Sequence, residues 1–434
     1  MSTDTTIDQT HGNLRFDKKK EFEFYRDLLQ NDFFRFWKKA IDHEHGGIYT
    51  CWTNDGSTRV STDKYIWSQG RSLYIFSKYI RLLDKGCFTD DRSFLMAAAE
   101  GIYQFIHKHA ILPEGEGVCA FLTEGDGKLK ESIPGKGYYT SFYVDTFVIA
   151  GFAEYAALTK KSRILDEAFE LYDRMQDYLN RGEIYSEPYQ ITPGFKAHGI
   201  PMILSNTAFV LYESAKKLGH PRCEQSLREA KGYSEEIFDQ FYDPKTHLIR
   251  ETVPLSSADE DAMIVNFYKP GHIIEDMWFQ LEIVEASGMD SAYYQKIGDI
   301  VEASYQLGWD PIYGGILREV DINGKKPDGR RVGDPLERLI DQSWNSKLWW
   351  VHSETLYTTL LCYLKFKEER FLDLYEQCKA YSFKVFPNPN QEIGEWIQIL
   401  DQDNKPMEKV VGLPVKDPYH IIRNFLKIVE ICME

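Results

Sequence analysis

The sequence predicts an all-α fold, an (α/α)6 barrel with short β-hairpins gathered at one mouth. Three observations lead to it: twelve segments have apolar residues at helical spacing, they follow one another in pairs, and short Gly-aromatic hairpins recur between them. The hairpin pattern returns about every 60–80 residues, as a structural repeat does. A flat α-solenoid competes, but its repeats are shorter, about 33–47 residues, and carry no regular β insertions. The observations therefore favour a closed ring of six helix pairs.

The twelve predicted helices rest on apolar and aromatic residues that recur every three or four positions. The first carries Phe22, Phe34 and Trp37, among others, on one face. The segments are 18–41, 65–83, 90–111, 139–159, 163–180, 201–218, 221–241, 272–287, 291–307, 349–367, 369–386 and 419–433.

The predicted β segments are short runs of alternating residues, several of which end in a turn signal such as Asp-Gly or Asn-Gly. They are 45–56, 117–127, 183–186, 247–253, 313–324 and 393–404. We expect residues 1–16 to form a flexible polar tail and residues 17–434 to form one barrel domain. The Gly/Pro-rich, charged segment 325–346 is the one long connection, which predicts a lid, a binding loop or a disordered stretch.

Composition narrows the class of protein. The 434 residues carry a net charge of -16, which argues against nucleic acid or an anionic membrane surface as a partner. Aromatic residues make up 14% of the chain and can both pack a core and stack on sugar rings. The N-terminus is polar and no apolar run is long enough to cross a bilayer, so we expect no signal peptide and no membrane span. Seven cysteines without a CxxC pattern favour a reducing, cytoplasmic setting.

The most informative stretch is Lys269-Pro-Gly-His-Ile-Ile-Glu-Asp-Met-Trp-Phe279. A Pro-Gly pair precedes a helix in which His272 and Glu275, three residues apart, share one face. Free N–H groups and the positive end of the helix dipole lie nearby, and such surroundings can adjust a base to neutral pH. The alternative is structural, with His272 as a helix-start residue and Glu275 closing a capping box.

Three further positions have comparable places at the starts of helices. Arg71 follows Trp67-Ser-Gln-Gly, and the stretch Trp349-Trp-Val-His-Ser-Glu354 carries two tryptophans with His352 and Glu354. The last helix begins Tyr419-His420-Ile-Ile-Arg423. Each also has a structural interpretation: Arg71 as an ion-paired residue, both tryptophans as core, His352 as a satisfied buried histidine and His420 as an ordinary first-turn residue. No dinucleotide or phosphate loop, zinc helix or serine elbow is found.

Six segments, in order over nearly the whole chain, make the sequence resemble the N-acylglucosamine 2-epimerase family, whose relatives isomerise mannose or epimerise cellobiose. They are Gly46-Gly47 with Trp67-x-Gln-Gly-Arg71, Tyr143-Val-Asp-Thr-Phe147 with Ala153-Glu-Tyr155, Pro270-Gly-His-x-x-Glu275, Lys347-Leu-Trp-Trp-x-His-Ser-Glu354, Gly394-Glu-Trp396 and Tyr419-His420-x-x-Arg423. The family has the (α/α)6 barrel that the helix count predicts independently.

The resemblance implies a catalytic pair, His272 and His420, with Arg71 and Glu275 holding an open-chain sugar. It implies that Tyr143, Trp350 and Glu354 line the pocket and that Arg423 binds the substrate. Mannose isomerases and cellobiose epimerases carry a further histidine on the helix that here begins Pro201-Met-Ile-Leu-Ser-Asn206. That segment has none, so Asn206 is the expected substitute, and His198 lies just upstream. The Pro-Met-x-Leu motif is similar to that of the N-acylglucosamine branch of the family.

The expected reaction is interconversion of N-acylglucosamine and N-acylmannosamine, or of a related aldose pair, through two-histidine proton transfer at C2. Arg71 is expected at O1 and Glu275 as the group that orients His272. No metal or cofactor is required; activation by a nucleotide such as ATP and a homodimer are implied by the resemblance alone. The alternatives are an aldose–ketose isomerase, a cellobiose or mannose 2-epimerase, an (α/α)6 glycoside hydrolase using Asp145 and Glu354, and a non-catalytic binding protein.

Overall fold

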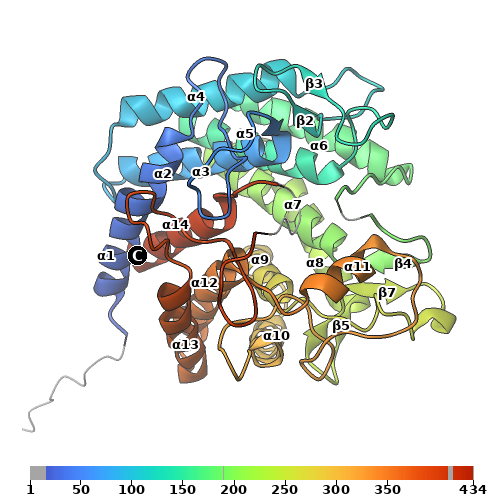
Figure 1. The fold of residues 1–434 in the computed structure, drawn as a ribbon. Helices are drawn as coiled ribbons and strands as arrows, with labels where there is room; N and C mark the ends of the chain where they lie inside the picture. The colour runs from blue at the N-terminus through green and yellow to red at the C-terminus, as the bar shows by residue number, and fades with distance from the viewer. Residues whose placement is uncertain (1–15, 189, 409–413, 434) are drawn as a thin grey trace, which may run out of the picture.

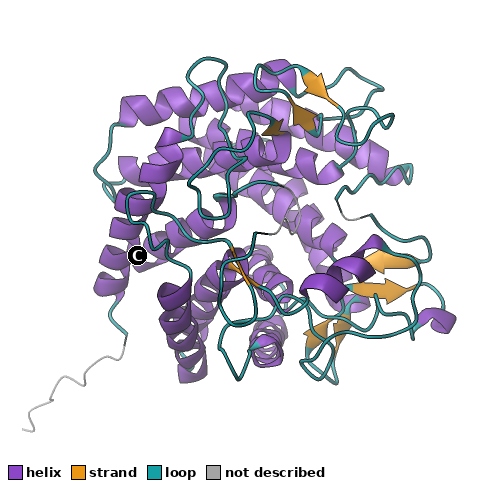
Figure 2. Ribbon diagram, in the orientation of Figure 1, coloured by secondary structure: helices purple, strands orange, loops and turns teal. Residues whose placement is uncertain are grey.

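The computed structural model describes residues 16–188, 190–408 and 414–433 (Figure 1). Helices dominate it, and the strands are short (Figure 2). Six inner helices form a closed ring, because each packs on the next and the last packs on the first. In ring order they are α3 (Ile66–Asp84), α5 (Phe142–Thr159), α7 (Gly199–Leu218), α9 (Pro270–Ser287), α12 (Trp349–Phe366) and α14 (Tyr419–Met433). The predicted (α/α)6 barrel is confirmed.

An outer layer of helices surrounds the ring, and each outer helix except α1 packs on the inner helix that follows or precedes it in the chain. The outer helices are α1 (Lys18–Leu28) with α2 (Phe34–Lys39), α4 (Arg92–His109), α6 (Ser162–Asn180), α8 (Cys223–Gln240), α10 (Ala292–Gly308) and α13 (Glu369–Val385). Helix α1 closes the outer layer by packing on α14 at the other end of the chain.

Sequence decides which helices lie inside. Nearly every residue of α5 is buried, including polar ones, since the helix contacts neighbours on both sides. Helix α6 is amphipathic instead, with one buried apolar face and a charged face toward solvent. A helix that is apolar all round is stable only when it is enclosed, whereas an amphipathic helix covers a core.

The short strands lie at the mouth of the barrel where the inner helices begin. Three of them, β1 (Lys64–Tyr65), β4 (Phe195–Ala197) and β8 (Lys347–Leu348), lead directly or within one residue into inner helices. They pair antiparallel with β2 (Leu122–Thr123), β7 (Thr252–Pro254) and β9 (Ile399–Leu400), while β3 (Leu129–Lys130) extends the first sheet and β5 (Tyr242–Asp243) pairs with β6 (Leu248–Ile249). The first turns of all six inner helices therefore face the same mouth.

The structure corrects two details. The predicted helix 18–41 is interrupted by a π-helical turn, Leu29–Phe33, between α1 and α2. The predicted long connection 325–346 contains a helix, α11 (Pro335–Ser343), whose cap Asp334 accepts the Leu336 N–H at 2.7 Å. An Asp-Pro pair at a helix start is a recognised sequence signal, which the Gly/Pro content of the segment obscured.

Helix α11 belongs to a small second hydrophobic cluster beside the mouth. Ile340 of α11 packs there with Phe195, Ile264 and Phe267, among other residues. Arg330 ties the same segment to Asp259 and Asp261, next to a short 3-10 turn, Ser257–Asp259. Segment 325–346 is thus a folded cover at one side of the mouth.

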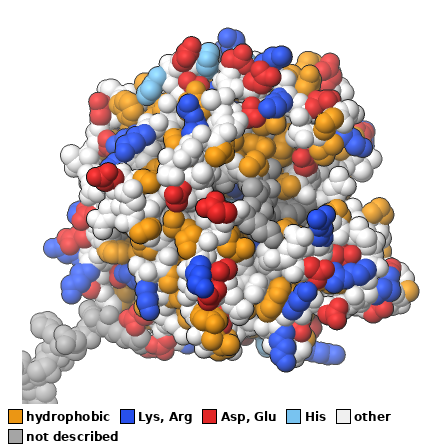
Figure 3. All heavy atoms as spheres, in the orientation of Figure 1, with side chains coloured by type: hydrophobic (Ala, Val, Ile, Leu, Met, Phe, Trp, Pro, Cys, Tyr) orange, Lys and Arg blue, Asp and Glu red, His pale blue; other side chains and the backbone are white. Residues whose placement is uncertain are grey.

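Of the predicted tail, 1–16, only Phe16 lies within the described residues, and its ring packs edge-on against Tyr363 at 5.5 Å. Among the described helices, none is long and apolar enough to cross a lipid bilayer. On the face in Figure 3, acidic and basic side chains are interspersed rather than gathered by sign.

Candidate active site

A cavity of about 350 Å³ opens at the mouth where the inner helices begin. That volume suits a small organic ligand. All six inner helices contribute to its lining, with the segments around β4, β7 and α11 on one side. The lining residues on the inner helices include Trp67, Arg71, Tyr143, Phe147, Met202, His272, Glu275, Trp350, Tyr419, His420 and Arg423. The cavity is therefore the candidate active site.

Arg71 is fixed in the cavity wall by aromatic rings and one carboxylate. Its Nη1 donates to Asp417 Oδ2 at 2.7 Å, and its guanidinium lies 4.0 Å from the centre of the Phe147 ring and 5.0 Å from that of Tyr419. Nη2 lies 3.4 Å from His420 Nε2. A cation anchored in this way can receive negative charge that develops on a substrate oxygen.

The residues before Arg71 explain why it reaches this place. A Cβ on Gly70 would lie 2.6 Å from the backbone of Phe147, so only glycine lets α3 and α5 approach this closely. Gln69 binds both the N–H and the C=O of Ile48, at 2.8 and 2.9 Å. The Gln-Gly-Arg sequence thus locks α3 to its neighbours and presents the guanidinium at the mouth.

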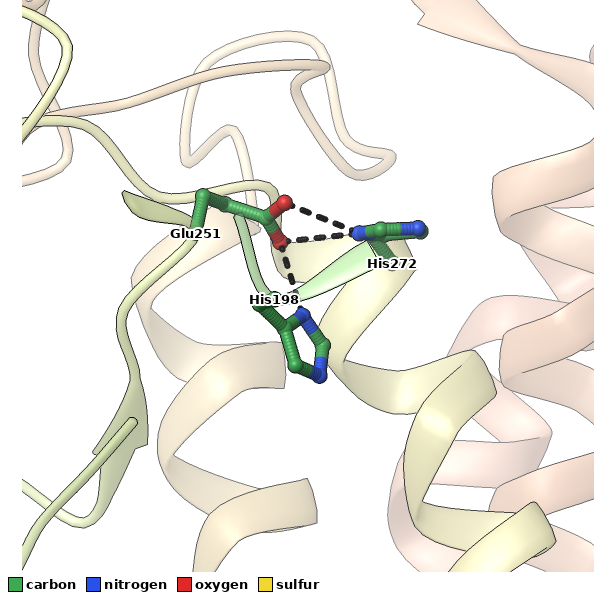
Figure 4. A group of neighbouring side chains, drawn as sticks. All are labelled: His198, Glu251 and His272. Atoms are coloured by element: carbon green, nitrogen blue, oxygen red, sulfur yellow. Dashed lines mark hydrogen bonds and ion pairs between the residues drawn. The ribbon is translucent and has the colours of Figure 1, made fainter. Parts of the chain in front are cut away.

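His272 is oriented by Glu251, which the sequence analysis did not identify. His272 Nδ1 lies 2.9 and 3.0 Å from the two carboxylate oxygens of Glu251, and the other ring nitrogen points away from that carboxylate (Figure 4). Burial alone would raise the pKa of Glu251, but His272 and His198 together lower it below its ordinary value. An ionised Glu251 holds the Nδ1–H tautomer of His272 and leaves Nε2 available to a substrate.

The predicted partner of His272 was wrong. Glu275 turns toward the last helix: its Oε1 accepts from Arg423 Nη2 at 2.6 Å and lies 3.3 Å from His420 Nδ1. It still lines the cavity. Residues three apart on a helix share a face only approximately, and here the narrow barrel brings Glu275 toward α14 instead.

His420 lies in a cluster formed by the inner helices alone. Its Nδ1 is 2.7 Å from Glu354 Oε1, and Glu354 also accepts from Arg423 Nη2 at 2.5 Å and from Trp278 Nε1 at 2.8 Å. Burial lowers the pKa of His420, but the nearby carboxylates of Glu275 and Glu354 outweigh it and raise the pKa above its ordinary value.

The shortest contact of the ring indicates the tautomer of His420. Nδ1 lies 2.7 Å from Glu354 Oε1 and 3.4 Å from Arg423 Nη2, so the nearer, carboxylate partner places the proton on Nδ1. Arginine has donors only, so Nε2 of neutral His420 is the acceptor that faces Arg71. His272 and His420 are therefore equivalent in one respect: each has Nδ1 bound to a buried carboxylate, which leaves Nε2 as the basic nitrogen.

Aromatic side chains complete the wall beside the two histidines. The Trp350 ring lies 5.2 Å from the His420 ring, and Tyr143 packs near Trp67, with 5.8 Å between ring centres. Burial raises the pKa of the Tyr143 hydroxyl, which is thus a neutral hydrogen-bonding group. Both predicted lining residues, Tyr143 and Trp350, border the cavity.

Two other predicted residues do not line the cavity. Glu354 lies behind His420 and acts on it rather than on a ligand. Asn206 is buried about two turns into α7, whereas residues such as Gly199 and Met202 near the helix start border the cavity. The expected substitution of a histidine by Asn206 therefore has no counterpart in this cavity lining.

The carboxylate pair nominated for a hydrolase is also absent from the cavity lining. Asp145 accepts from the Cys119 N–H at 3.0 Å and the Tyr139 hydroxyl at 2.9 Å, inside the wall between helices. Burial raises the pKa of Asp145 well above its usual range. It fastens the loop after α4 to α5.

His352 has the structural role that the alternative interpretation gave it. The ring is fully buried and accepts from the Ile316 N–H at 3.0 Å through Nε2, while Nδ1 lies 2.7 Å from the Leu348 carbonyl. Burial lowers its pKa to about 3, so it stays neutral.

Comparisons with known proteins agree with this geometry. The family description N-acylglucosamine 2-epimerase (GlcNAc 2-epimerase) matches residues 46–424. The N-acylglucosamine 2-epimerase of Mus musculus is 25% identical over 395 residues, which cover 89% of this chain and 86% of that protein. The cellobiose 2-epimerase of Dictyoglomus turgidum is 23% identical over 410 residues, covering 93% and 96%.

The fold is shared with solved structures. The cellobiose 2-epimerase of Bacillus thermoamylovorans superimposes with a TM-score of 0.74 at 20% sequence identity, covering 95% of this chain and 99% of that one. Since the family match spans nearly the whole barrel, including both histidine-bearing helices, the chain belongs to the N-acylglucosamine 2-epimerase family.

Proposed function

We propose that the protein is a sugar 2-epimerase that interconverts an N-acylglucosamine and the matching N-acylmannosamine by proton transfer at C2 between His272 and His420. One observation carries the proposal: both histidines line one cavity, and each has Nδ1 on a buried carboxylate, which leaves Nε2 as the basic nitrogen. Two such groups, with no hydrolytic carboxylate pair at the nominated positions, suit removal and return of a proton.

The reaction needs an acidic C2–H, which exists only when the sugar ring is open and C1 is an aldehyde. One imidazole removes the C2 proton, and the C–H electron pair moves into the C1–C2 bond as O1 becomes an enolate oxygen. The other imidazole gives a proton to C2 on the opposite face. Inversion requires that the two nitrogens address opposite faces of C2, and the two histidines reach the cavity from different helices, α9 and α14.

Arg71 stabilises the charge on O1 in this scheme. Its guanidinium adjoins His420 Nε2 and is held by Asp417, so it needs little reorganisation when the charge forms. One such fixed donor contributes about 3 kcal/mol to transition-state stabilisation in enzymes with an oxyanion site. Glu275 and Arg423 border the cavity as a pair and are placed to hold sugar hydroxyls.

Incubation with N-acetylglucosamine, N-acetylmannosamine, mannose, glucose and cellobiose in D2O tests the proposal. We expect inverted N-acetylated aldoses with deuterium at C2. A ketose product from the same panel would instead identify an aldose–ketose isomerase, in which the proton returns to C1. Turnover of cellobiose alone, release of reducing sugar from an oligosaccharide, or binding without turnover would contradict the proposed reaction.

We propose N-acylated sugars as substrates for two reasons. Helix α7 contains the sequence Pro201-Met-Ile-Leu204, which is like the N-acylglucosamine branch, and similar proteins such as that of Mus musculus are N-acylglucosamine 2-epimerases. Activation by ATP, a homodimer and a cytoplasmic location stay predictions. The mechanism assigns no step to a metal or a cofactor.

A further inference from the structure

A third histidine, His198, lies directly behind the His272–Glu251 pair (Figure 4). Its side chain is fully buried, so it cannot touch a substrate. Nε2 lies 2.9 Å from Asp276 Oδ2, and Nδ1 lies 3.8 Å from Glu251 Oε1, the oxygen that also contacts His272. The four groups follow one another in the order Asp276, His198, Glu251, His272.

The backbone places these groups in register. Strands β4 and β7 pair with Ala197 opposite Thr252, and the next residue, His198, donates its backbone N–H to the Glu251 carbonyl at 2.9 Å. His272 and Asp276 are four residues apart on α9 and so lie on one face. The first and last of the four side chains, Asp276 and His272, therefore lie one helical turn apart on α9. The other two, His198 and Glu251, are held together by the pairing of β4 with β7.

Geometry indicates the charge of His198. Asp276 also accepts from Gln280 Nε2 at 2.6 Å through Oδ1, and the two neighbouring carboxylates favour a proton on His198, so His198 Nε2 is assigned as the donor to Asp276 Oδ2. Were His198 neutral, its Nδ1 lone pair would face the carboxylate of Glu251, an unfavourable arrangement in a buried place. A proton on Nδ1 turns the same contact into an attraction. The two carboxylates outweigh burial and raise the pKa of His198 to about 9.

We propose that His198 is a positioning residue that stays an imidazolium between Asp276 and Glu251, fixes Glu251 against His272 and limits how strongly Glu251 attracts a proton to His272. The expected change in the kcat/KM profile rests on the proposed function, whereas the expected charge of His198 does not. Since Glu251 divides its charge between two histidines, His272 can release the proton that it takes from C2.

Other charged and titratable groups surround this unit. Helix α9 supplies Asp276, His272 and, at its start, Lys269, whose positive charge also stabilises ionised Glu251. The same helix supplies Glu275, whose ionised form His272 helps to stabilise. Helix α5 supplies the Tyr143 hydroxyl, which burial and Glu251 keep protonated. His198 is thus the cation that lies between two carboxylates.

His198→Gln is the main test, because glutamine can still donate to Asp276 but carries no charge. We expect His272 to bind its proton more tightly, since Glu251 and Asp276 then act on it without the intervening cation. We consider the reaction in the direction in which His272 accepts the C2 proton. The acid limb of its kcat/KM profile against pH should move to higher pH by about one unit, which lowers kcat/KM at pH 6 by about tenfold. An acid limb that stays at the wild-type pH in the folded variant would overturn the proposal, whatever happens to kcat.

Asp276→Asn is the second variant and keeps the shape of the site. It removes the carboxylate that does most to hold the proton on His198, so we expect His198 to become neutral. Loss of that cation outweighs loss of the more distant Asp276 charge, so the acid limb should move in the same direction but by less. His352→Gln is the matched control: it also removes a fully buried histidine from the barrel, but a neutral one outside the cavity lining. Its acid limb should stay at the wild-type position, and an equal shift there would overturn the assignment to His198.

A measurement without substrate separates this inference from the proposed reaction. In wild-type protein labelled with 15N-histidine, we expect one ring, assigned by its loss in His198→Gln, to carry protons on both nitrogens at pH 8. A spectrum at pH 8 in which every histidine ring is neutral would overturn the proposal even if neither variant folds. If instead this ring is doubly protonated but no sugar is epimerised, the proposed reaction fails and the positioning role stands.

Discussion

His420 and His272 line the same cavity, but different parts of the fold hold them. His420 is fastened by Glu354 and Glu275 from inner helices, with the buried guanidinium of Arg423 between the two carboxylates. His272 is fastened by Glu251, which lies between two short strands outside the ring. One base is thus positioned by the barrel itself, and the other depends on the chain segments at its mouth.

The two clusters also differ in the kind of cation they contain. Arg423 keeps its charge at any accessible pH, and its surroundings raise its pKa further. The two side chains that contact the Glu251 carboxylate are histidines, a residue type whose charge changes near neutral pH. We therefore expect the His420 cluster to be rigid and important for stability, and the His272 cluster to respond to pH.

The largest expected effect is common to both bases. Replacing either His272 or His420 with Ala should abolish epimerisation, a loss of at least about 1,000-fold, because each proton transfer needs its own base. Each variant should still exchange the C2 proton of one epimer with D2O, and the two variants should act on opposite epimers. NMR of the recovered sugars gives both results.

Circular dichroism serves as the folding control for those variants. Epimerisation retained in either variant would contradict the two-base assignment. If both variants exchanged the C2 proton of the same epimer, the two histidines would not act as separate bases on opposite faces, which would contradict the comparison between them.

Removing one orienting carboxylate from each cluster should lower activity equally but stability unequally. Glu354→Gln and Glu251→Gln should each lower kcat by about 100-fold, since the imidazole loses the group that sets its tautomer. Glu354→Gln should also lower the free energy of unfolding by about 3 kcal/mol, because Arg423 is left as a buried cation with fewer partners. Glu251→Gln should cost about 1 kcal/mol, since the histidines can release protons instead.

Urea denaturation at pH 7 measures both values, with wild-type protein as the reference. Equal losses of stability in the two variants would mean that the barrel and the mouth contribute equally to holding their bases, contrary to the distinction drawn above.

The pH dependence of stability should show the charge of His198 in the mouth cluster. The raised pKa of His198, about 9 against an ordinary 6.5, stabilises the folded state fully below pH 6.5, and this contribution is lost as pH rises through about 9. The difference amounts to about 3 kcal/mol. The free energy of unfolding of the wild type should fall over this range by more than that of His198→Gln; parallel curves would contradict the charge of His198.

The smallest expected effect is that of a chelator. Two groups, His198 with Glu251 and His272, and Glu275 with Glu354 and His420, each bring one side-chain N or O atom per residue within 4.8 Å, close enough for a cation. Hydrogen bonds and ion pairs among these side chains already account for both arrangements, so dialysis against EDTA should leave kcat unchanged. Activity lost to EDTA and restored by a divalent metal would contradict the metal-free mechanism.

Much of the fold and part of the site could be predicted from sequence. Periodicity placed the helices to within a few residues, since inner and outer helices both bury apolar faces. Arg71, His272 and His420 stood out because they lie within the first two turns of predicted inner helices, which a ring brings together. Their roles in the proposed reaction were implied by the resemblance to the family.

The missed groups are those that non-local pairing brings in. Glu251 was within a predicted β segment, but its position opposite His198 depends on the pairing of β4 with β7, more than 50 residues apart in the chain. Asp417 precedes the last helix and reaches Arg71 only once the ring is closed. The true direction of Glu275 likewise depends on which neighbour offers a cation, and sequence spacing does not contain that information.

The pairing of β4 with β7 has a consequence for how such an enzyme can diverge. This ladder carries Glu251 and His198 into place from outside the ring, so substitutions in it can change the working pH of one base without disturbing the core. The His420 cluster offers no such freedom, because its members are also structural parts of the helices. Directed evolution aimed at 188–198 and 248–256 should therefore alter pH optimum and sugar preference with little loss of thermal stability, while the opposite base stays as it is.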